Sequence, residues 1–137
     1  MWDIARAHAD EHRWLLSQER GYDVGGDAYR DWCVKYWRRF CRWRYVEHLL
    51  GLCRYQEFNA ELHGRLKTRE TLESDIVLGF VLDQFLYAER ENLELFVFAP
   101  ETYPRNRLLE ATILLNVNDA RVDLPEWGRL SMTTHCA

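Results

Sequence analysis

The sequence predicts an all-α protein, a compact bundle of five or six helices. Three observations support this class. Apolar residues recur every three or four positions over most of the chain, which is the spacing of an amphipathic helix. Capping residues and glycines stand where these segments begin and end. The chain has 137 residues, of which 47% are hydrophobic and only 3 are proline, and this fits a single helical domain over residues 1–137.

The first two predicted helices have the clearest signals. They cover residues 3–20 and 27–50, with an aspartate at each start and a glycine directly after each end. On the first helix, His8 and His12 fall on the apolar side and are expected to face inward. The second helix has a stripe with a 4-3-4-3 spacing, formed by Tyr29, Cys33, Tyr36, Phe40, Trp43, Glu47 and Leu50.

Three further helices are expected over residues 52–67, 71–89 and 104–115. The helix over 71–89 is apolar on all sides, so it is predicted to lie at the centre of the bundle or against a partner chain. Residues 93–99 form a short apolar run that suits a strand or a helix, and we favour a helix because its neighbours are helical. Residues 118–137 read as an extended or loosely docked tail.

Composition and charge narrow the classes of function. A net charge of −4 opposes binding to a polyanion except through a local basic patch. The first residues lack the apolar run of a signal peptide, and no stretch is long and apolar enough to span a bilayer. We therefore expect a cytoplasmic protein with no membrane partner. The cysteines lack the spacing of a zinc finger or redox motif and are expected to be free thiols: Cys33, Cys41, Cys53 and Cys136.

One candidate site is for a metal ion. The run H-A-D-E-H, residues 8–12, places two imidazoles one helical turn apart, and it is similar to the H-x-x-E-H pattern of inverted zinc peptidases in these five letters alone. Carboxylates on apolar stripes of other helices would complete a site for one divalent ion, as in a hydrolase. The alternative is that these groups satisfy one another, for example Glu47 with Arg44, without a cofactor. The candidate ligands are His8, His12, Glu47 and Asp83, with His48 or His63 as substitutes.

A second candidate is a basic stripe on the second helix. Projection on a helical wheel places four cations on one solvent-facing side, where they could follow a phosphate backbone. The alternatives are a protein-partner surface and a solvated face that pairs with acidic residues between 89 and 94. The stripe consists of Lys35, Arg38, Arg39 and Arg42.

A third candidate lies between residues 91 and 112, where two short helices would form a helix-turn-helix. Arg105, Asn106 and Arg107 would then stand at the start of the second helix, where bases are read. The turn glycine usual in that motif is missing, and an ordinary helical hairpin is the alternative.

The leading hypothesis for function is a non-enzymatic interaction module that self-associates or docks on a protein partner. The sequence has no nucleophile motif and no glycine-rich phosphate loop, which disfavours a conventional enzyme. Its aromatic share of 14% and the apolar helix over 71–89 suggest a surface for a partner, with Val81 and Phe85 as candidate interface residues. A metal-binding helical protein and a small nucleic-acid-binding protein are the alternatives.

Overall fold

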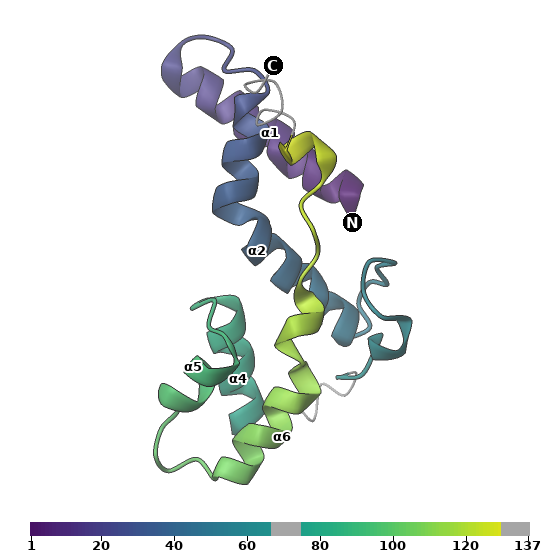
Figure 1. Ribbon diagram of the computed structural model, residues 1–137, viewed down its shortest axis with the longest axis vertical. Helices are drawn as coiled ribbons and strands as arrows, with labels where there is room; N and C mark the ends of the chain where they lie inside the picture. Colours follow the sequence, from purple (N-terminus) through teal and green to yellow (C-terminus); the bar gives the residue numbers. More distant parts are fainter. Residues whose placement is uncertain (67–74, 130–137) are drawn as a thin grey trace. The chain divides into compact units, whose positions relative to one another are not determined.

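The computed structural model describes residues 1–66 and 75–129, and over these ranges its regular structure is helical, with no strand. Figure 1 shows the helices along the chain. The prediction of an all-α protein is thus confirmed. Among the described helices, none combines the length and the apolar character that crossing a bilayer requires.

The chain forms two compact units, and each is considered by itself. Unit 1 comprises residues 1–40 and 122–137, and unit 2 comprises residues 41–121. The boundary falls within helix α2, which runs from Asp27 to Leu49. The single domain expected over residues 1–137 stays a prediction.

Unit 1 is based on a helical hairpin. Helix α1, Trp2–Arg20, ends at Gly21, whose backbone is left-handed (φ 79°) and whose N–H donates to the carbonyl of Ser17 at 2.9 Å. Glycine adopts this conformation at little cost, so the stop predicted from the sequence is confirmed. The predicted start of this helix is corrected, because Met1 rather than Asp3 occupies the N-cap position.

Aromatic rings fill the interior of unit 1. The ring of Trp32 lies 5.5 Å from that of Phe40 and 6.2 Å from that of Trp127, measured between centroids. The indole N–H of Trp37 donates to the carbonyl of Val122 at 2.7 Å. Trp127 belongs to a short helical stretch, so the part of the predicted tail that the structure describes in unit 1 is docked rather than loose.

Unit 2 contains three helices that contact one another: α4 (Ile76–Leu86), α5 (Asn92–Val97) and α6 (Arg105–Leu115) (Figure 1). A 3-10 helix, η2 (Val117–Ala120), follows. Helix α5 confirms the choice of helix for residues 93–99, and α6 confirms the last predicted helix. Residues 71–74 of the helix expected over 71–89 lie outside the described residues. Within the described part, helix α4 covers Ile76–Leu86, so it ends three residues before the predicted end. The interior includes Val77, Leu78, Val81, Phe85, Leu95, Leu108 and Leu115.

The helix expected over residues 52–67 is wrong. Within 52–66 the described helical structure is one short 3-10 helix, η1 (Ala60–Leu62). The imidazole of the buried His48 holds this segment in turns, because its Nδ1 accepts the N–H of Tyr55 at 3.1 Å and its Nε2 donates to the carbonyl of Asn59 at 2.9 Å. The stripe expected to be buried is nevertheless buried: Tyr55, Phe58, Leu62 and Leu66.

Candidate functional site

The two histidines proposed as metal ligands are engaged within unit 1. His12 Nε2 lies 2.7 Å from a carboxylate oxygen of Asp31, on the first half of α2. His8 is exposed, which corrects the expectation that it faces inward, although its ring edge still packs 5.6 Å from the ring of Phe40. One turn of helix places the two imidazoles on neighbouring positions, but each meets a different partner.

The proposed carboxylate ligands belong to unit 2. Glu47 accepts a hydrogen bond from the hydroxyl of Tyr55 at 2.7 Å and pairs with Arg44 at 2.6 Å. The pairing with Arg44 is the one that the sequence analysis gave as the alternative to a metal site. Asp83 is exposed, so its predicted inward position is wrong. The cause is that α4 has a solvent side, on which Asp83 is neighboured by the exposed Ile76 and Tyr87.

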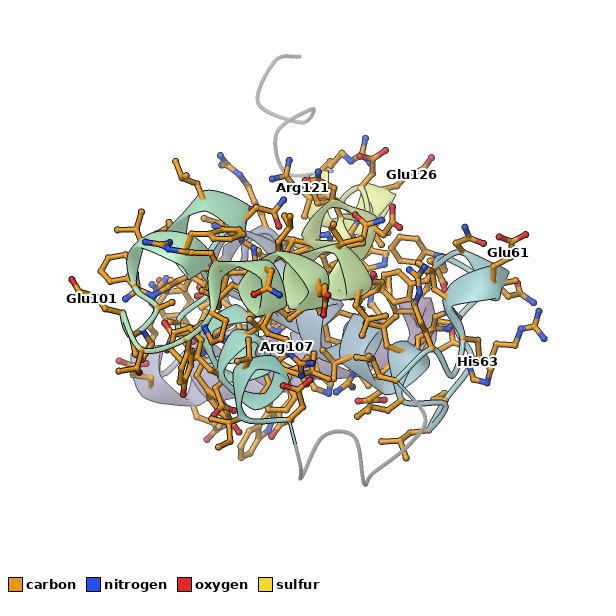
Figure 2. The ribbon with its side chains drawn as sticks, turned by 90° about the horizontal axis from the view of Figure 1, so that it is seen from below. Glu61, His63, Glu101, Arg107, Arg121 and Glu126 are labelled. Carbon is orange, nitrogen blue, oxygen red and sulfur yellow. The ribbon has the colours of Figure 1, made fainter. Side chains whose placement is uncertain are left out.

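Of the substitute ligands, His48 uses both ring nitrogens in the hydrogen bonds described above. His63 lies beside it, with 5.1 Å between the ring centroids, in the turn after η1 (Figure 2). Among residues 1–66 and 75–129, no group of three or more His, Cys, Asp or Glu side chains is placed to hold a metal ion.

The basic stripe on α2 loses one of its four members. Arg42 is 3% exposed and lies inside unit 2, where its guanidinium donates to the carbonyls of Phe85 (3.0 Å) and Arg90 (2.8 Å) and to Glu91 (3.0 Å). Its predicted solvent-facing position is therefore wrong. The other three members, Lys35, Arg38 and Arg39, are exposed in unit 1. Of these, Lys35 pairs with Asp31.

The start of α6 has the three polar residues considered as base readers. Arg105, Asn106 and Arg107 are all exposed there, as the sequence predicted. Arg107 (Figure 2) is held by Asp75, with 2.8 Å between its Nη2 and a carboxylate oxygen. A role in reading bases stays a prediction, and the ion pair reduces the charge available for it.

Val81 and Phe85, the candidate interface residues, are core. Both are 0% exposed within unit 2. The apolar circumference of α4 is explained largely by contacts with α5, α6 and α2, since the guanidinium of Arg42 lies 4.4 Å from the Phe85 ring centre. The prediction that these two side chains face outward is wrong.

A groove that the sequence did not reveal lies in unit 1, where α1 ends and the chain turns toward α2. Its volume is about 530 Å³. We call it the α1 groove. It is lined by Asp10, Arg13, Trp14, Ser17, Gln18, Gly21, Tyr22 and Asp23.

An ion pair holds one side of the α1 groove. Arg13 binds Asp23 through two parallel hydrogen bonds, from Nε at 3.1 Å and from Nη2 at 2.8 Å. The backbone N–H of Gly25 donates to the same carboxylate at 3.0 Å. These donors, Arg13 above all, lower the pKa of Asp23 to about 2. The turn is further tied to α1 because the N–H of Val24 donates to the hydroxyl of Ser17 at 3.1 Å.

Further hydrogen bonds connect two residues of the α1 groove, Asp10 and Arg13, to Tyr29 on α2. The hydroxyl of Tyr29 donates to Asp10 Oδ1 at 2.8 Å and lies 3.2 Å from Arg13 Nη1. The guanidinium of Arg6 lies 4.2 Å from the centre of the Tyr29 ring and 3.4 Å from Asp10. The polar residues of the groove are thus positioned by contacts within unit 1.

Two aromatic side chains in the lining of the α1 groove face solvent. Trp14 is 61% exposed and Tyr22 is 62% exposed, in contrast to the buried rings that fill the interior of unit 1. A sequence signal existed, because Trp14 lies one turn from Asp10 and one turn from Gln18, on a polar side of α1. The lining contains no histidine, cysteine or lysine, and the hydroxyl of Ser17 already accepts a hydrogen bond.

Comparison with protein-family models, with curated proteins and with solved structures found no match.

Proposed function

We propose that this protein is a non-enzymatic interaction module that binds a segment of a protein partner in the α1 groove. The observation that carries the proposal is the exposure of Trp14 and Tyr22 beside a fixed Arg13 in one concave surface. Tryptophan, tyrosine and arginine are the residues most enriched among those that dominate the binding energy of protein interfaces.

The rigidity of the groove favours binding. The two hydrogen bonds between Arg13 and Asp23 and the bond from Tyr29 to Asp10 hold the lining in place before a partner arrives. A surface that is already ordered loses less conformational entropy on association, so more of the contact energy is available as affinity. Exposed aromatic rings also provide a large contact area with few rotatable bonds.

Panning a random peptide library on the immobilised protein tests the proposal. We expect the wild-type protein to enrich a set of related peptides, and Trp14→Ala to weaken their binding about tenfold, because truncation of a central anchor commonly costs more than 1 kcal/mol. The matched control is Leu52→Ala, which removes another highly exposed apolar side chain from unit 2.

The proposal predicts a difference between these two variants. Both should retain the helical circular dichroism of the wild type, while Trp14→Ala alone loses the enriched peptides. A library that yields no related sequences, or peptides that bind Trp14→Ala as well as the wild type, would contradict the proposal.

A further inference from the structure

We infer that the partner segment is basic, and that an arginine or lysine side chain of it lies on Trp14 next to Asp10. This inference rests on the proposed function and identifies the chemical class of its partner. The geometry and charge of the α1 groove carry it.

The stretch that forms the α1 groove has an excess of negative charge. Between residues 10 and 27 there are five carboxylates and two guanidinium groups. One of the two, Arg13, is turned onto Asp23 by two hydrogen bonds, so these two charges offset each other and four carboxylates remain against Arg20. Two of the five carboxylates, Asp10 and Asp23, line the α1 groove. The other three are its neighbours in the sequence: Glu11, Glu19 and Asp27.

A second hollow continues the acidic surface. It has a volume of about 290 Å³ and shares Tyr22 with the α1 groove, so the two hollows adjoin at this ring. Asp27 and Asp31 line it, together with Arg20, and Asp31 also pairs with Lys35 at 3.1 Å and with His12 at 2.7 Å. Asp27 is exposed in the first turn of α2, and its carboxylate has no described partner. An approaching polycation would therefore meet carboxylates on both sides of Tyr22.

Three side chains along α1 could together contact one long cationic side chain of a partner. Asp10, Trp14 and Gln18 are spaced by four residues, so they follow one another along one side of the helix. The carboxylate of Asp10 is 54% exposed, and its Oδ1 accepts the hydroxyl of Tyr29 and lies 3.4 Å from Nε of Arg6. A guanidinium or ammonium over the indole of Trp14 gains a cation–π contact and reaches Oδ2 of Asp10, for which no hydrogen bond is described.

Fluorescence anisotropy with a dye-labelled hexa-arginine peptide tests the inference, with a hexa-glutamate peptide of the same length for comparison. We expect the wild-type protein to bind the arginine peptide and not the glutamate peptide. Trp14→Ala should weaken binding about tenfold through the lost cation–π contact. Asp10→Asn should weaken it about fivefold, because a partly exposed ion pair contributes at most about 1 kcal/mol.

The matched control for charge is Glu61→Gln, which removes one exposed carboxylate from η1 in unit 2 (Figure 2). Asp10→Asn keeps an oxygen that accepts the Tyr29 hydroxyl, so its fold should be preserved. Binding that falls equally in Asp10→Asn and Glu61→Gln would overturn the inference, because it would reflect net charge alone. Failure of the arginine peptide to bind would overturn it as well.

The outcomes separate this inference from the proposed function. If library panning yields neutral or acidic peptides that require Trp14, the α1 groove is a binding site and the inference of a basic partner is wrong. If panning yields no groove-dependent peptide, the proposed function itself fails.

Discussion

A single arginine links two segments of unit 2 that are far apart in the sequence. The guanidinium of Arg42 joins the last turn of α4, at Phe85, to the turn that leads into α5, at Arg90 and Glu91. Buried carbonyls need donors, and a planar guanidinium reaches three acceptors at once. A residue that the sequence placed on a solvent stripe therefore belongs to the structural interior.

Replacement of Arg42 by lysine should destabilise the protein. Lysine keeps the charge but cannot reproduce the fork of hydrogen bonds, so we expect the free energy of unfolding to fall by about 2 kcal/mol. Chemical denaturation measures this loss. Arg39→Lys is the control, because this neighbour is exposed and should change stability by no more than about 0.5 kcal/mol. Equal stabilities of the two variants would contradict a buried role for Arg42.

Two glycines should respond in opposite ways to alanine. A Cβ added at Gly128 would lie 2.5 Å from the sulfur of the buried Cys33, whereas one added at Gly79 in α4 meets nothing within 4 Å. We expect Gly128→Ala to lower the free energy of unfolding by about 1–3 kcal/mol through overpacking. Gly79→Ala should raise it by about 0.5–1 kcal/mol through helix propensity.

Thermal or chemical unfolding of both variants checks this pair. Cys33→Ala provides a control for Gly128→Ala, because it removes the sulfur that the new methyl group would meet. In the Cys33→Ala background, Gly128→Ala should lower the free energy of unfolding much less than it does in the wild type. If Gly128→Ala destabilises the protein equally in the Cys33→Ala background, the destabilisation does not come from the contact with the sulfur of Cys33.

Asp23 should titrate at unusually low pH. The hydrogen bonds from Arg13 and from the Gly25 backbone lower its folded-state pKa from 3.8 to about 2. A lowered pKa means that the ionised carboxylate stabilises the fold: this contribution is complete above the unfolded pKa and is lost as the pH falls through about 2. Carbon-13 NMR of the carboxyl group measures the midpoint. In Arg13→Lys the midpoint should rise toward 3.8, and a wild-type midpoint already at 3.8 would refute the ion pair.

At the scale of elements, the sequence predicted helix ends well wherever a local signal determines them. Gly21 ends α1, and an aspartate begins α2, as expected. The failure over residues 52–67 has a different physical origin. Two hydrogen bonds to the His48 ring, from a helix that precedes this segment, stabilise turns that a helix would exclude. The apolar periodicity correctly predicted burial but could not predict the element.

The candidate site was harder to predict than the fold. Of the proposed metal ligands, only Glu47 had a partner that the sequence suggested, Arg44, which is close to it along the helix. The partners of the histidines and of Arg42 come from residues distant in the sequence, so local patterns did not reveal them. The α1 groove depends on Tyr22, in a turn, and on Trp14, on the outer side of a helix. An exposed and a buried tryptophan have the same letter, and only the packing of neighbouring helices distinguishes them.

The interior position of α4 gives a sharp prediction for Phe85. Truncation of this fully buried ring in Phe85→Ala should lower the free energy of unfolding by about 3–5 kcal/mol. Ile76→Ala on the solvent side of the same helix should cost much less. Calorimetry or denaturant titration distinguishes them. If Phe85→Ala keeps wild-type stability, the ring is not core.

At the scale of the whole molecule, most of the aromatic excess is explained by packing. The rings of Trp32 and Trp37 are buried in unit 1, with the half-buried ring of Trp127 beside Trp32, and the ring of Tyr45 is buried in unit 2 with its hydroxyl donating to the carbonyl of Leu115. The aromatic share of the sequence is thus weaker evidence for a partner than the exposure of Trp14 alone. Composition counts residues, whereas the proposed function depends on the aromatic side chains that packing leaves exposed.

The reactivity of the cysteines can be used to test the packing of both units in one experiment. Cys33 in unit 1 and Cys41 in unit 2 are buried, while Cys53 is exposed. Burial also raises the pKa of the Cys33 thiol to about 11, which leaves little reactive thiolate. In a Cys136→Ser background, we expect a thiol reagent to modify Cys53 quickly and the other two only as their unit opens. Mass spectrometry of the labelled peptides measures the three rates, and rapid labelling of all three would contradict the packing.

The division of unit 1 into residues 1–40 and 122–137 has a consequence for its biosynthesis. A ribosome that has translated the first segment of unit 1, up to Phe40 in the middle of α2, must still translate all 81 residues of unit 2 (41–121) before Val122 and Trp127 emerge. At about 5–20 residues per second, this takes about 4–16 seconds. Throughout that interval Trp32 lacks Trp127, so the nascent hairpin exposes aromatic surface that chaperones recognise, and unit 2 has the earlier opportunity to fold.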